Sequence, residues 1–283
     1  HVGVVGVTMG NLAAINSAVD KRTDGSTLTV AQLQALVDSY YRILSEADST
    51  STDTIVYPST GISNPTVTDY TNIGASVGNA KSVDLLNDVV GQSAKTAVDT
   101  VDELNVIAKA AYNVMLQAGV NAGSASAPAA FTSDNEWVAG LTAMGITGVT
   151  SSNIAAIKAA IAATSTAGTA NDGLEVDTVQ EIKDLLKPLI AQQVLREYTD
   201  TNGFSTAPTL STYADAGIKT FKSLTDTGIS NRKNLNDSST ASGAESNTFL
   251  TAAILNTALD KLAGSSLTYD ATYSGTVQKM VDS

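Results

Sequence analysis

The feature that most constrains the fold of this chain is an internal repeat with a period of about 71 residues. The block at residues 4–15, VVGVTMGNLAAI, returns as ITGVTSSNIAAI at residues 146–157. A second block at residues 65–74 returns at residues 208–217, and both intervals are close to twice the period. Self-similarity on this scale indicates supersecondary units that each bury an apolar face on the next unit.

A divergent middle copy accounts for the doubled interval. The run TVAQL at residues 29–33 corresponds to TVDEL at residues 100–104, a single period later. Gly145 follows Gly74 at the same interval. The chain therefore divides into four expected units, of which the second is divergent and the fourth is the weakest copy: residues 4–74, 75–145, 146–217 and 218–283.

Each unit predicts a short helix, a long helix and a second short helix. In the first unit Thr8 is the expected N-cap, because its hydroxyl can accept a hydrogen bond from an orphan backbone N–H. The apolar residues that follow recur at spacings of three and four, as on one face of a helix: Leu12, Ile15 and Val19. The third unit repeats this design with Thr150 followed by Ile154, Ile157 and Ile161.

The long helix of each unit carries its own apolar stripe. The expected core positions are Val30, Leu33, Val37, Tyr40 and Leu44 in the first unit, Val101, Leu104, Ala108, Ala111 and Met115 in the second, and Val179, Ile182, Leu186, Leu189 and Val194 in the third. Pro188 lies inside the last of these helices and predicts a kink or a split, because proline removes one helical hydrogen bond. Tyr40 and Tyr41 are adjacent, so one of the two rings is expected to lie outside the core.

The third helix of the first unit is bracketed by residues that favour helix ends. Asn64 is the expected cap, Pro65 suits the first helical position, and Gly74 suits the left-handed position after the last turn. Residues 208–217 repeat this bracket in the third unit. The Ser-, Gly- and Pro-containing stretch at residues 119–130 predicts a loop.

The expected fold class is all-α, a tandem array of about four three-helix repeat units. Helices as short as the first of each unit are marginal alone in water, so they need neighbouring helices. Two arrangements fit, separate bundles joined as beads or a continuous stack. The junction between Gly74 and Ala75 leaves no flexible linker, which favours a semi-rigid stack.

Composition and charge exclude several classes of function. The 283 residues contain no cysteine and a single histidine, His1, which excludes disulfides, thiolate metal sites and a Ser–His–Asp triad. The net charge is −12 and no basic run occurs, so neither nucleic acid nor anionic lipid is an expected partner. No run of about 18 apolar residues is present, so we expect no membrane insertion.

No catalytic, cofactor or metal residues are predicted. Ser230 and Lys233 have a Ser-x-x-Lys spacing, but the further motifs of penicillin-binding enzymes are absent. The acidic residues at 99–103 fall at an expected helix start, where negative charge suits the helix dipole. The sequence contains no calcium-binding loop motif. If Gly203 is placed at position six of an EF-hand loop, position one is Tyr198, which is not acidic.

Trp137 is the one candidate ligand-binding residue. It is the only tryptophan and follows an acidic loop at residues 134–136. Its ring could stack on a sugar, with Phe131 or Phe221 contributing to an exposed aromatic patch. The alternative interpretation is that Trp137 packs in the core, and packing is the more common fate of such a residue.

The repeated blocks resemble a known family. The run Pro-Thr-Val-x-Asp-Tyr, then Gly, then Val/Ile-Thr-Gly-Val-Thr-x-x-Asn-Leu-Ala-Ala-Ile, is similar to the helical tandem repeats of very large secreted bacterial surface proteins of the adhesin-like or RTX-like type. In this chain the resemblance is carried by residues 65–70, 208–213, 4–15 and 146–157. The resemblance covers the first and third units well and the other two in outline. It implies an extracellular, repetitive, structural role and no catalytic residues.

The function expected from these observations is non-enzymatic. The chain is expected to be a structural or spacer segment of a large protein at the bacterial cell surface, with neighbouring repeats as its first partners. Self-association into a filament or an S-layer-like sheet is an extension of this hypothesis. The alternative is a module of a surface adhesin that binds a glycan or a protein.

Overall fold

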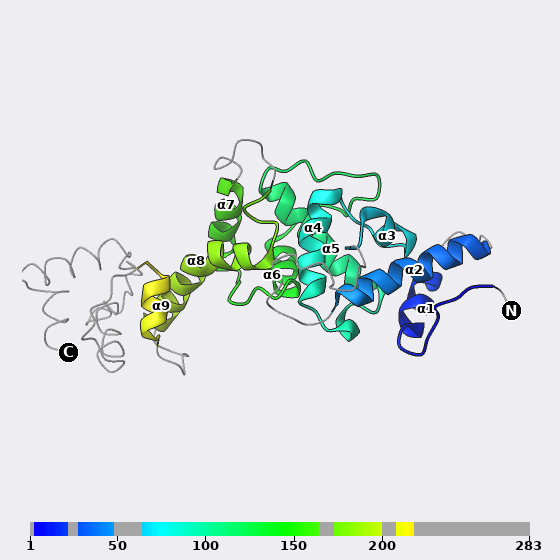
Figure 1. Cartoon of the computed structure of the whole chain (residues 1–283). Coiled ribbons are helices and arrows are strands. Elements are labelled where there is room, and N and C mark those ends of the chain that lie inside the picture. The colour runs from blue at the N-terminus through cyan, green and yellow to red at the C-terminus, as the bar shows by residue number, and fades with distance from the viewer. Residues whose placement is uncertain (1–2, 22–27, 48–63, 165–172, 200–207, 218–283) are drawn as a thin grey trace, which may run out of the picture. The chain divides into compact units, whose positions relative to one another are not determined.

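The computed structural model describes residues 3–21, 28–47, 64–164, 173–199 and 208–217. Within these residues the chain forms nine α-helices, one 3-10 turn and no strand, so the expected all-α class is confirmed (Figure 1). The fourth expected unit lies outside the described residues. The chain separates into two compact parts, residues 1–185 and 186–283. Their boundary falls inside a helix and matches none of the boundaries between the expected units.

The helices follow one another as short, long and short, three times over. We call these the first, second and third groups. The first group consists of α1 (Leu12–Asp20), α2 (Val30–Glu46) and α3 (Val67–Asn72). The second consists of α4 (Ala80–Gly91), the 3-10 turn η1 (Lys95–Ala97), α5 (Val101–Gln117) and α6 (Asp134–Ala143). The third consists of α7 (Ile154–Thr164), α8 (Val179–Thr199) and α9 (Leu210–Asp215).

The start of the first helix differs from the prediction. Thr8 is not the N-cap, because α1 begins four residues later and Asn11 precedes it. The Asn11 side chain instead folds back over the preceding loop: its Oδ1 accepts from the Thr8 N–H at 2.7 Å and its Nδ2 donates to the Gly6 carbonyl at 2.9 Å. The acceptor and the donor of an amide are separate atoms, so this one side chain satisfies two backbone groups of the loop at once.

The same loop closure precedes α7. Asn153 Oδ1 accepts from the Thr150 N–H at 2.8 Å, and Asn153 Nδ2 donates to the Gly148 carbonyl at 2.8 Å. Asn153 has the place in the second copy of the repeated block that Asn11 has in the first, and both side chains are buried. Thr150, like Thr8, is therefore not the capping residue that the sequence predicted.

We expect Asn11→Ala and Asn153→Ala each to lower the free energy of unfolding by about 1–2 kcal/mol, because each leaves two backbone groups of a loop without their partner. Thr8→Ala is the control and should stay within about 0.5 kcal/mol of the parent chain. Urea unfolding followed by circular dichroism measures all three. A Thr8→Ala variant as costly as Asn11→Ala would show that the hydroxyl, and not the amide, fixes the loop.

Each long helix begins with a capping box. Thr29 accepts from the Gln32 N–H while the Gln32 side chain accepts from the Thr29 N–H. Thr100 and Glu103 form the same pair at the start of α5. Thr178 and Glu181 form it at the start of α8. Each box satisfies two orphan backbone donors reciprocally, and the acidic residues at 102 and 103 lie in the first turn of α5 as expected.

The short third helix begins later than predicted. Thr66, and not Asn64, is the N-cap of α3, and it forms a capping box with Asp69. Pro65 therefore lies just before the cap and not at the first helical position, and Thr209 caps α9 in the same way. The predicted left-handed glycine is confirmed, since Gly74 has a φ of +87°.

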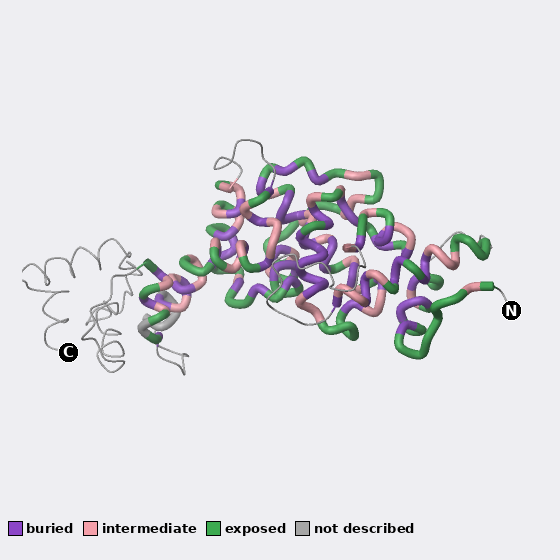
Figure 2. Tube along the Cα trace, viewed as in Figure 1, coloured by how far each residue is buried: buried purple, intermediate pink, exposed green. Residues whose placement is uncertain are grey.

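The predicted stripes of α5 and α7 are confirmed in full, since every residue in both lists is buried (Figure 2). In α8 the stripe is right at its first three positions, whereas Leu189 and Val194 are only half-buried.

The stripes of the first group are only partly right. In α2 the prediction holds at Val37, Tyr40 and Leu44, but it missed Leu36 and Ile43. Tyr40 is buried and the adjacent Tyr41 is exposed, which confirms the prediction that one of the two rings lies outside the core. The stripe of α1 is wrong at both ends, because its buried residues are Ala14, Ile15 and Ala18, while Leu12 and Val19 are exposed.

Within residues 1–185 the helix groups pack directly on one another. Helices α1 and α2 of the first group contact α5 and α4 of the second, and α5 and α6 contact α7 of the third (Figure 1). The Tyr70 hydroxyl on α3 donates to Asn87 Oδ1 on α4 at 2.8 Å. A side-chain hydrogen bond thus joins α3 to α4 across the junction near Gly74.

Pro188 does not split α8, which runs from Val179 to Thr199 with the proline inside it. In the second compact part, Lys187 forms an ion pair with Asp215 at 2.9 Å, and Gln192 donates to the Ala216 carbonyl at 3.3 Å. These contacts hold α9 against the second half of α8.

Candidate functional site

No group of three His, Cys, Asp or Glu side chains in the described residues could hold a metal ion. None of the helices in this part of the chain is both long and apolar enough to cross a membrane. The candidate site residues are Trp137 and the buried polar side chains.

Trp137 lies on α6 and is only 7% exposed. Its ring meets Phe131 edge-on, with centroids 5.2 Å apart and planes at 67°. Such an edge-to-face contact is the preferred packing of aromatic rings in a core. The structure therefore brings Trp137 and Phe131 together but gives the tryptophan the surroundings of a packed residue, whereas a ring that stacks on a sugar needs an open face. Phe221, the other aromatic candidate, lies outside the described residues.

Charged residues border this aromatic pair. The Lys109 ammonium lies 5.2 Å from the centre of the Phe131 ring and 2.7 Å from the Glu136 carboxylate. Glu136 also accepts from the Thr132 N–H at 2.6 Å, in the loop that leads into α6. The hydrogen bond from Lys109, followed by those from Thr132, lowers the pKa of Glu136 to about 2. These contacts tie the loop to α5 and leave no free acid or base beside Trp137.

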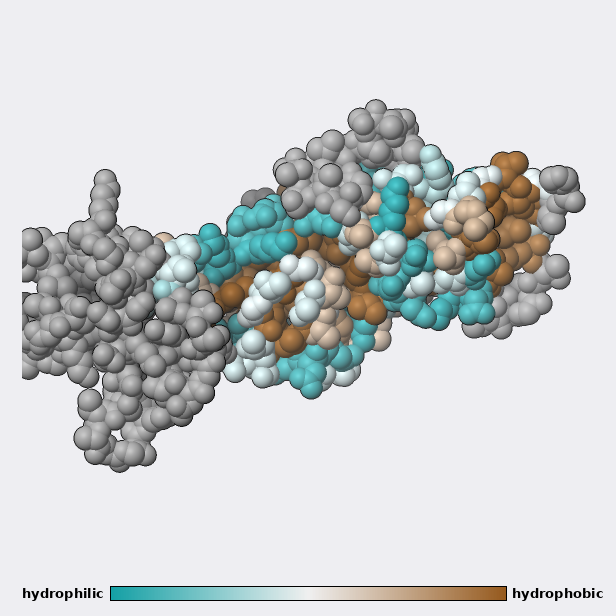
Figure 3. All heavy atoms as spheres, turned by 90° about the horizontal axis from the view of Figure 1, so that it is seen from below, coloured by the Kyte–Doolittle hydropathy of each residue, from teal (hydrophilic) through white to brown (hydrophobic). Residues whose placement is uncertain are grey.

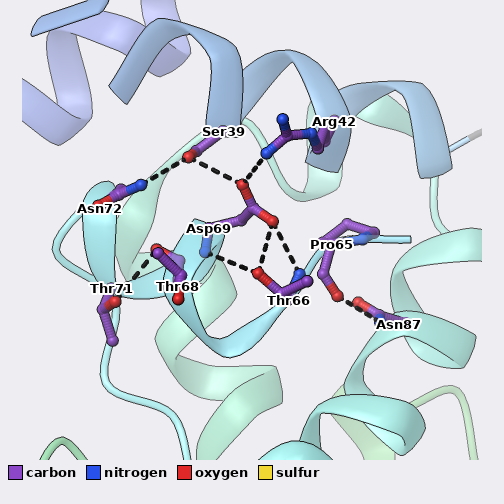
Figure 4. A network of polar contacts seen from close by, with 9 residues as sticks. All are labelled: Ser39, Arg42, Pro65, Thr66, Thr68, Asp69, Thr71, Asn72 and Asn87. Atoms are coloured by element: carbon purple, nitrogen blue, oxygen red, sulfur yellow. Dashed lines mark hydrogen bonds and ion pairs between the residues drawn. The ribbon is translucent and has the colours of Figure 1, made fainter. Parts of the chain in front are cut away.

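The densest polar network surrounds Asp69, at the N-terminus of α3 (Figure 4). Its carboxylate is almost fully buried and accepts from Ser39 Oγ at 3.0 Å and from the Arg42 guanidinium, both on α2. The same carboxylate accepts from the Thr66 N–H at 2.9 Å and the Thr66 hydroxyl at 2.8 Å. Asp69 is thus both the partner in a capping box and the anchor of α3 on α2.

The network continues into the next helix group. Asn87 on α4 donates to the Pro65 carbonyl at 2.9 Å (Figure 4). Asn87 also accepts from the Tyr70 hydroxyl. Burial by itself would raise the pKa of Asp69, but hydrogen bonds from Thr66, Ser39 and Arg42 outweigh it and lower that pKa. The carboxylate therefore stays ionised and stabilises the packing of α3 on α2. It has no open side on which a substrate could lie.

A second buried carboxylate joins α4 to α8. Asp88 Oδ2 accepts from the Val179 N–H, the first backbone donor of α8, at 2.6 Å. Nearby, Asp177 lies among Glu181 on α8 and Asp84 and Lys81 on α4. Burial, a hydrogen bond with Glu181 and the charges of Glu181 and Asp84 raise the pKa of Asp177 to about 7, against a smaller opposite effect of Lys81.

The raised pKa of Asp177 makes stability depend on pH. The folded chain holds this proton more tightly than the unfolded chain, so the stability it contributes is present at low pH and is lost as the pH rises from about 4 through 7. We expect Asp177→Asn to raise the free energy of unfolding by about 1 kcal/mol at pH 8 and to change it little at pH 4, because the site is partly solvated and screened.

Urea unfolding at pH 4, 6 and 8 measures this effect. Asp184→Asn, the same change on the exposed face of α8, is the matched control and should leave the pH dependence of the parent chain intact. If Asp177→Asn loses as much stability between pH 4 and pH 8 as the parent chain does, Asp177 is not the group that causes the pH dependence.

The sequence analysis missed both Asp69 and Asp88. A signal for Asp69 was present, because Thr66 and Asp69 have the spacing of a capping box. No local signal marks Asp88, because its partner Val179 is 91 residues away. Asp69 and Asp88 thus both join helices to one another. Comparisons of the chain with family models, with curated proteins and with solved structures found no match.

Proposed function

We propose that this chain is a non-enzymatic structural spacer, a segment of a large extracellular protein of the bacterial cell surface. The observation that carries the proposal is the direct packing of successive short-long-short helix groups through buried polar contacts. Tyr70 with Asn87 at one junction and Asp88 with Val179 at the next support a semi-rigid connection. In this proposal the three groups are the first three of the four repeat units.

The surface chemistry supports the same role. A net charge of −12 resists non-specific association between crowded chains. The extracellular bacterial location rests on the resemblance of residues 65–70 and 146–157 to surface-protein repeats. The burial of Trp137 supports the spacer hypothesis over the glycan-binding one.

Distance distributions between spin labels test the spacer proposal. The chain has no cysteine, so engineered cysteines are labelled without background. Tyr41→Cys on α2 with Val106→Cys on α5 spans the first two groups, and Tyr41→Cys with Ala156→Cys on α7 spans three; all three positions are exposed. A semi-rigid spacer gives one narrow distribution for each pair. A broad distribution for either pair would mean that the groups move independently, and the spacer proposal would fail.

A further inference from the structure

The sequence Asp-Thr-Val-x-Glu occurs at the start of both later long helices. It spans residues 99–103 at α5 and residues 177–181 at α8. In each copy the threonine and the glutamate form the capping box, and the aspartate forms a further hydrogen bond with that glutamate. Two carboxyl groups can form such a bond only when one of them carries a proton. The first group has Leu28 and Gln32 at these positions, so it has a capping box without a carboxyl pair.

The carboxyl pair at the start of α8 lies against a part of α4 that carries Lys81, Asp84 and Asp88. Burial, the bond and charge of the glutamate, and the charge of Asp84 raise the pKa of Asp177, against a smaller effect of Lys81. Two residues further along, the Val179 N–H donates to Asp88 Oδ2 at 2.6 Å, and Val179 itself is fully buried. The protonation of Asp177 therefore acts on the same turn that is bonded to α4.

The carboxyl pair at the start of α5 has different neighbours. There the neutral Ser17 on α1 accepts from the Val101 N–H at 3.0 Å, and Ser17 lies one repeat period before Asp88. Burial and then Glu103 raise the pKa of Asp99. The pair at α8 differs because a carboxylate on the adjacent helix adds to these two causes. The two copies of the pattern therefore differ in how strongly the fold favours the proton.

We propose that the proton held between Asp177 and Glu181 is a latch, which closes the start of α8 onto α4 and opens when the proton is lost. In the closed form one carboxyl group donates to the other, and the pair carries a single negative charge. Loss of the proton leaves two adjacent negative charges that face Asp84, with Lys81 as the neighbouring cation. Like charges this close repel each other, so the deprotonated pair pushes the start of α8 away from α4.

The surroundings of the pair suit a latch that responds to pH. Broad areas of the surface in Figure 3 are hydrophilic, and water and salt screen the charges there. Asp177 and Glu181 are half-buried, so their charges are screened less, yet the proton can still reach water. The pKa of Asp177 is about 7 in the folded chain and near 4 in the unfolded chain, so the latch opens as the pH rises between these values. The inference rests on the proposed spacer function and adds that one of its junctions loosens as the pH rises.

Hydrogen exchange of the Val179 amide between pH 5 and pH 8 tests the proposal, followed by NMR and corrected for the intrinsic effect of pH on exchange. We expect the protection factor of this amide to fall about tenfold or more over the range, because opening the latch releases one proton. At pH 8 the Val179 amide should exchange faster than amides in the interior of α5, since a latch opens locally. Equal protection at the two places would mean that the Val179 amide exchanges only when the whole chain unfolds, and would overturn the proposal.

Asp177→Asn has no proton to lose, so the protection of the Val179 amide should change less than about twofold over the same range. Glu181→Gln should shift the fall in protection to lower pH, and it retains a capping box of the kind that Gln32 forms in the first group. Asp99→Asn is the matched control, the same change in the other copy of the pattern, and should show the pH dependence of the parent chain. A constant protection factor in the parent chain overturns the inference, and so does an undiminished fall in Asp177→Asn.

The latch and the spacer proposal can fail separately. The spin labels lie on α2, α5 and α7, and their distances are measured at pH 5, where the latch is closed. Protection that does not depend on pH therefore leaves the spacer proposal standing, whereas broad spin-label distributions contradict the spacer proposal whatever the latch does.

Discussion

Asp69→Ala should lower the free energy of unfolding by about 3 kcal/mol, the largest effect that we expect from a polar residue in this chain. The change removes the acceptor for Ser39, Arg42 and the Thr66 cap together, and leaves these donors beside a cavity. Removing one partner of a buried ion pair is costly because the remaining charge loses its compensation. Arg42 is 41% exposed, so water recovers part of that cost and keeps the effect below the upper end for such pairs.

The matched control is Asp102→Ala. Asp102 also pairs with a cation, Lys21 at 2.7 Å, but its side chain is 73% exposed, whereas that of Asp69 is 3% exposed. Exposed pairs contribute little, so the control should lose less than about 1 kcal/mol. Guanidinium unfolding of both variants gives the comparison. Similar losses in the two would mean that Asp69 acts only as a surface charge.

The pH dependence of Asp69 runs opposite to that of Asp177. The lowered pKa of Asp69 contributes stability that is present above the unfolded value near 4 and is lost as the pH falls below it. Acid unfolding of Asp69→Ala should therefore be less steep below pH 4 than that of the parent chain.

Gly78→Ala should lower the free energy of unfolding by about 2–3 kcal/mol, even though glycine to alanine is usually a mild change. A Cβ at this position would lie 2.6 Å from the Ala122 carbonyl oxygen and 2.8 Å from the Tyr112 ring. The Ala122 carbonyl cannot withdraw freely, because it accepts from the Asn79 N–H at 2.8 Å. Overpacking a fixed backbone contact of this kind forces the chain to shift, at a cost of a few kcal/mol.

Gly10→Ala is the control for this variant. A Cβ there meets only the Thr8 hydroxyl, at 3.8 Å, so stability should change by less than about 0.5 kcal/mol. Thermal unfolding followed by circular dichroism measures both variants. An equally mild Gly78→Ala would show that the loop at residues 121–124 is free to move away from α4.

The sequence predicted what depends on neighbours along the chain and missed what depends on distant ones. The stripes of α5 and α7 were read correctly because those helices are flanked by other helices on the face that periodicity marks. Leu12 and Val19 obey the same periodicity but are exposed. Periodicity reports which face is apolar and cannot report whether a partner covers it.

The candidate site shows the same limit. Trp137 was singled out by its chemistry, yet its burial follows from the position of Phe131, which only the folded chain reveals. Asp177 has an ordinary sequence context, and its pKa is raised first by burial, then by Glu181, and further by Asp84, which lies on α4 and far earlier in the sequence. The positions of helix ends depend mainly on nearby residues, so the sequence predicted them approximately. The errors at Thr8 and Asn64 arose because several polar residues near each end could serve as the cap.

The packing of later helices on earlier ones also sets an order for folding during synthesis. A ribosome releases the chain from its N-terminus, so α1 and α2 emerge before α4 and α5, which pack on them. Each newly made group then meets a surface that already exists. Growth from the opposite end would leave the side of α4 that packs on α2 exposed to water until α2 arrived, so the helix order has a direction in time as well as in space.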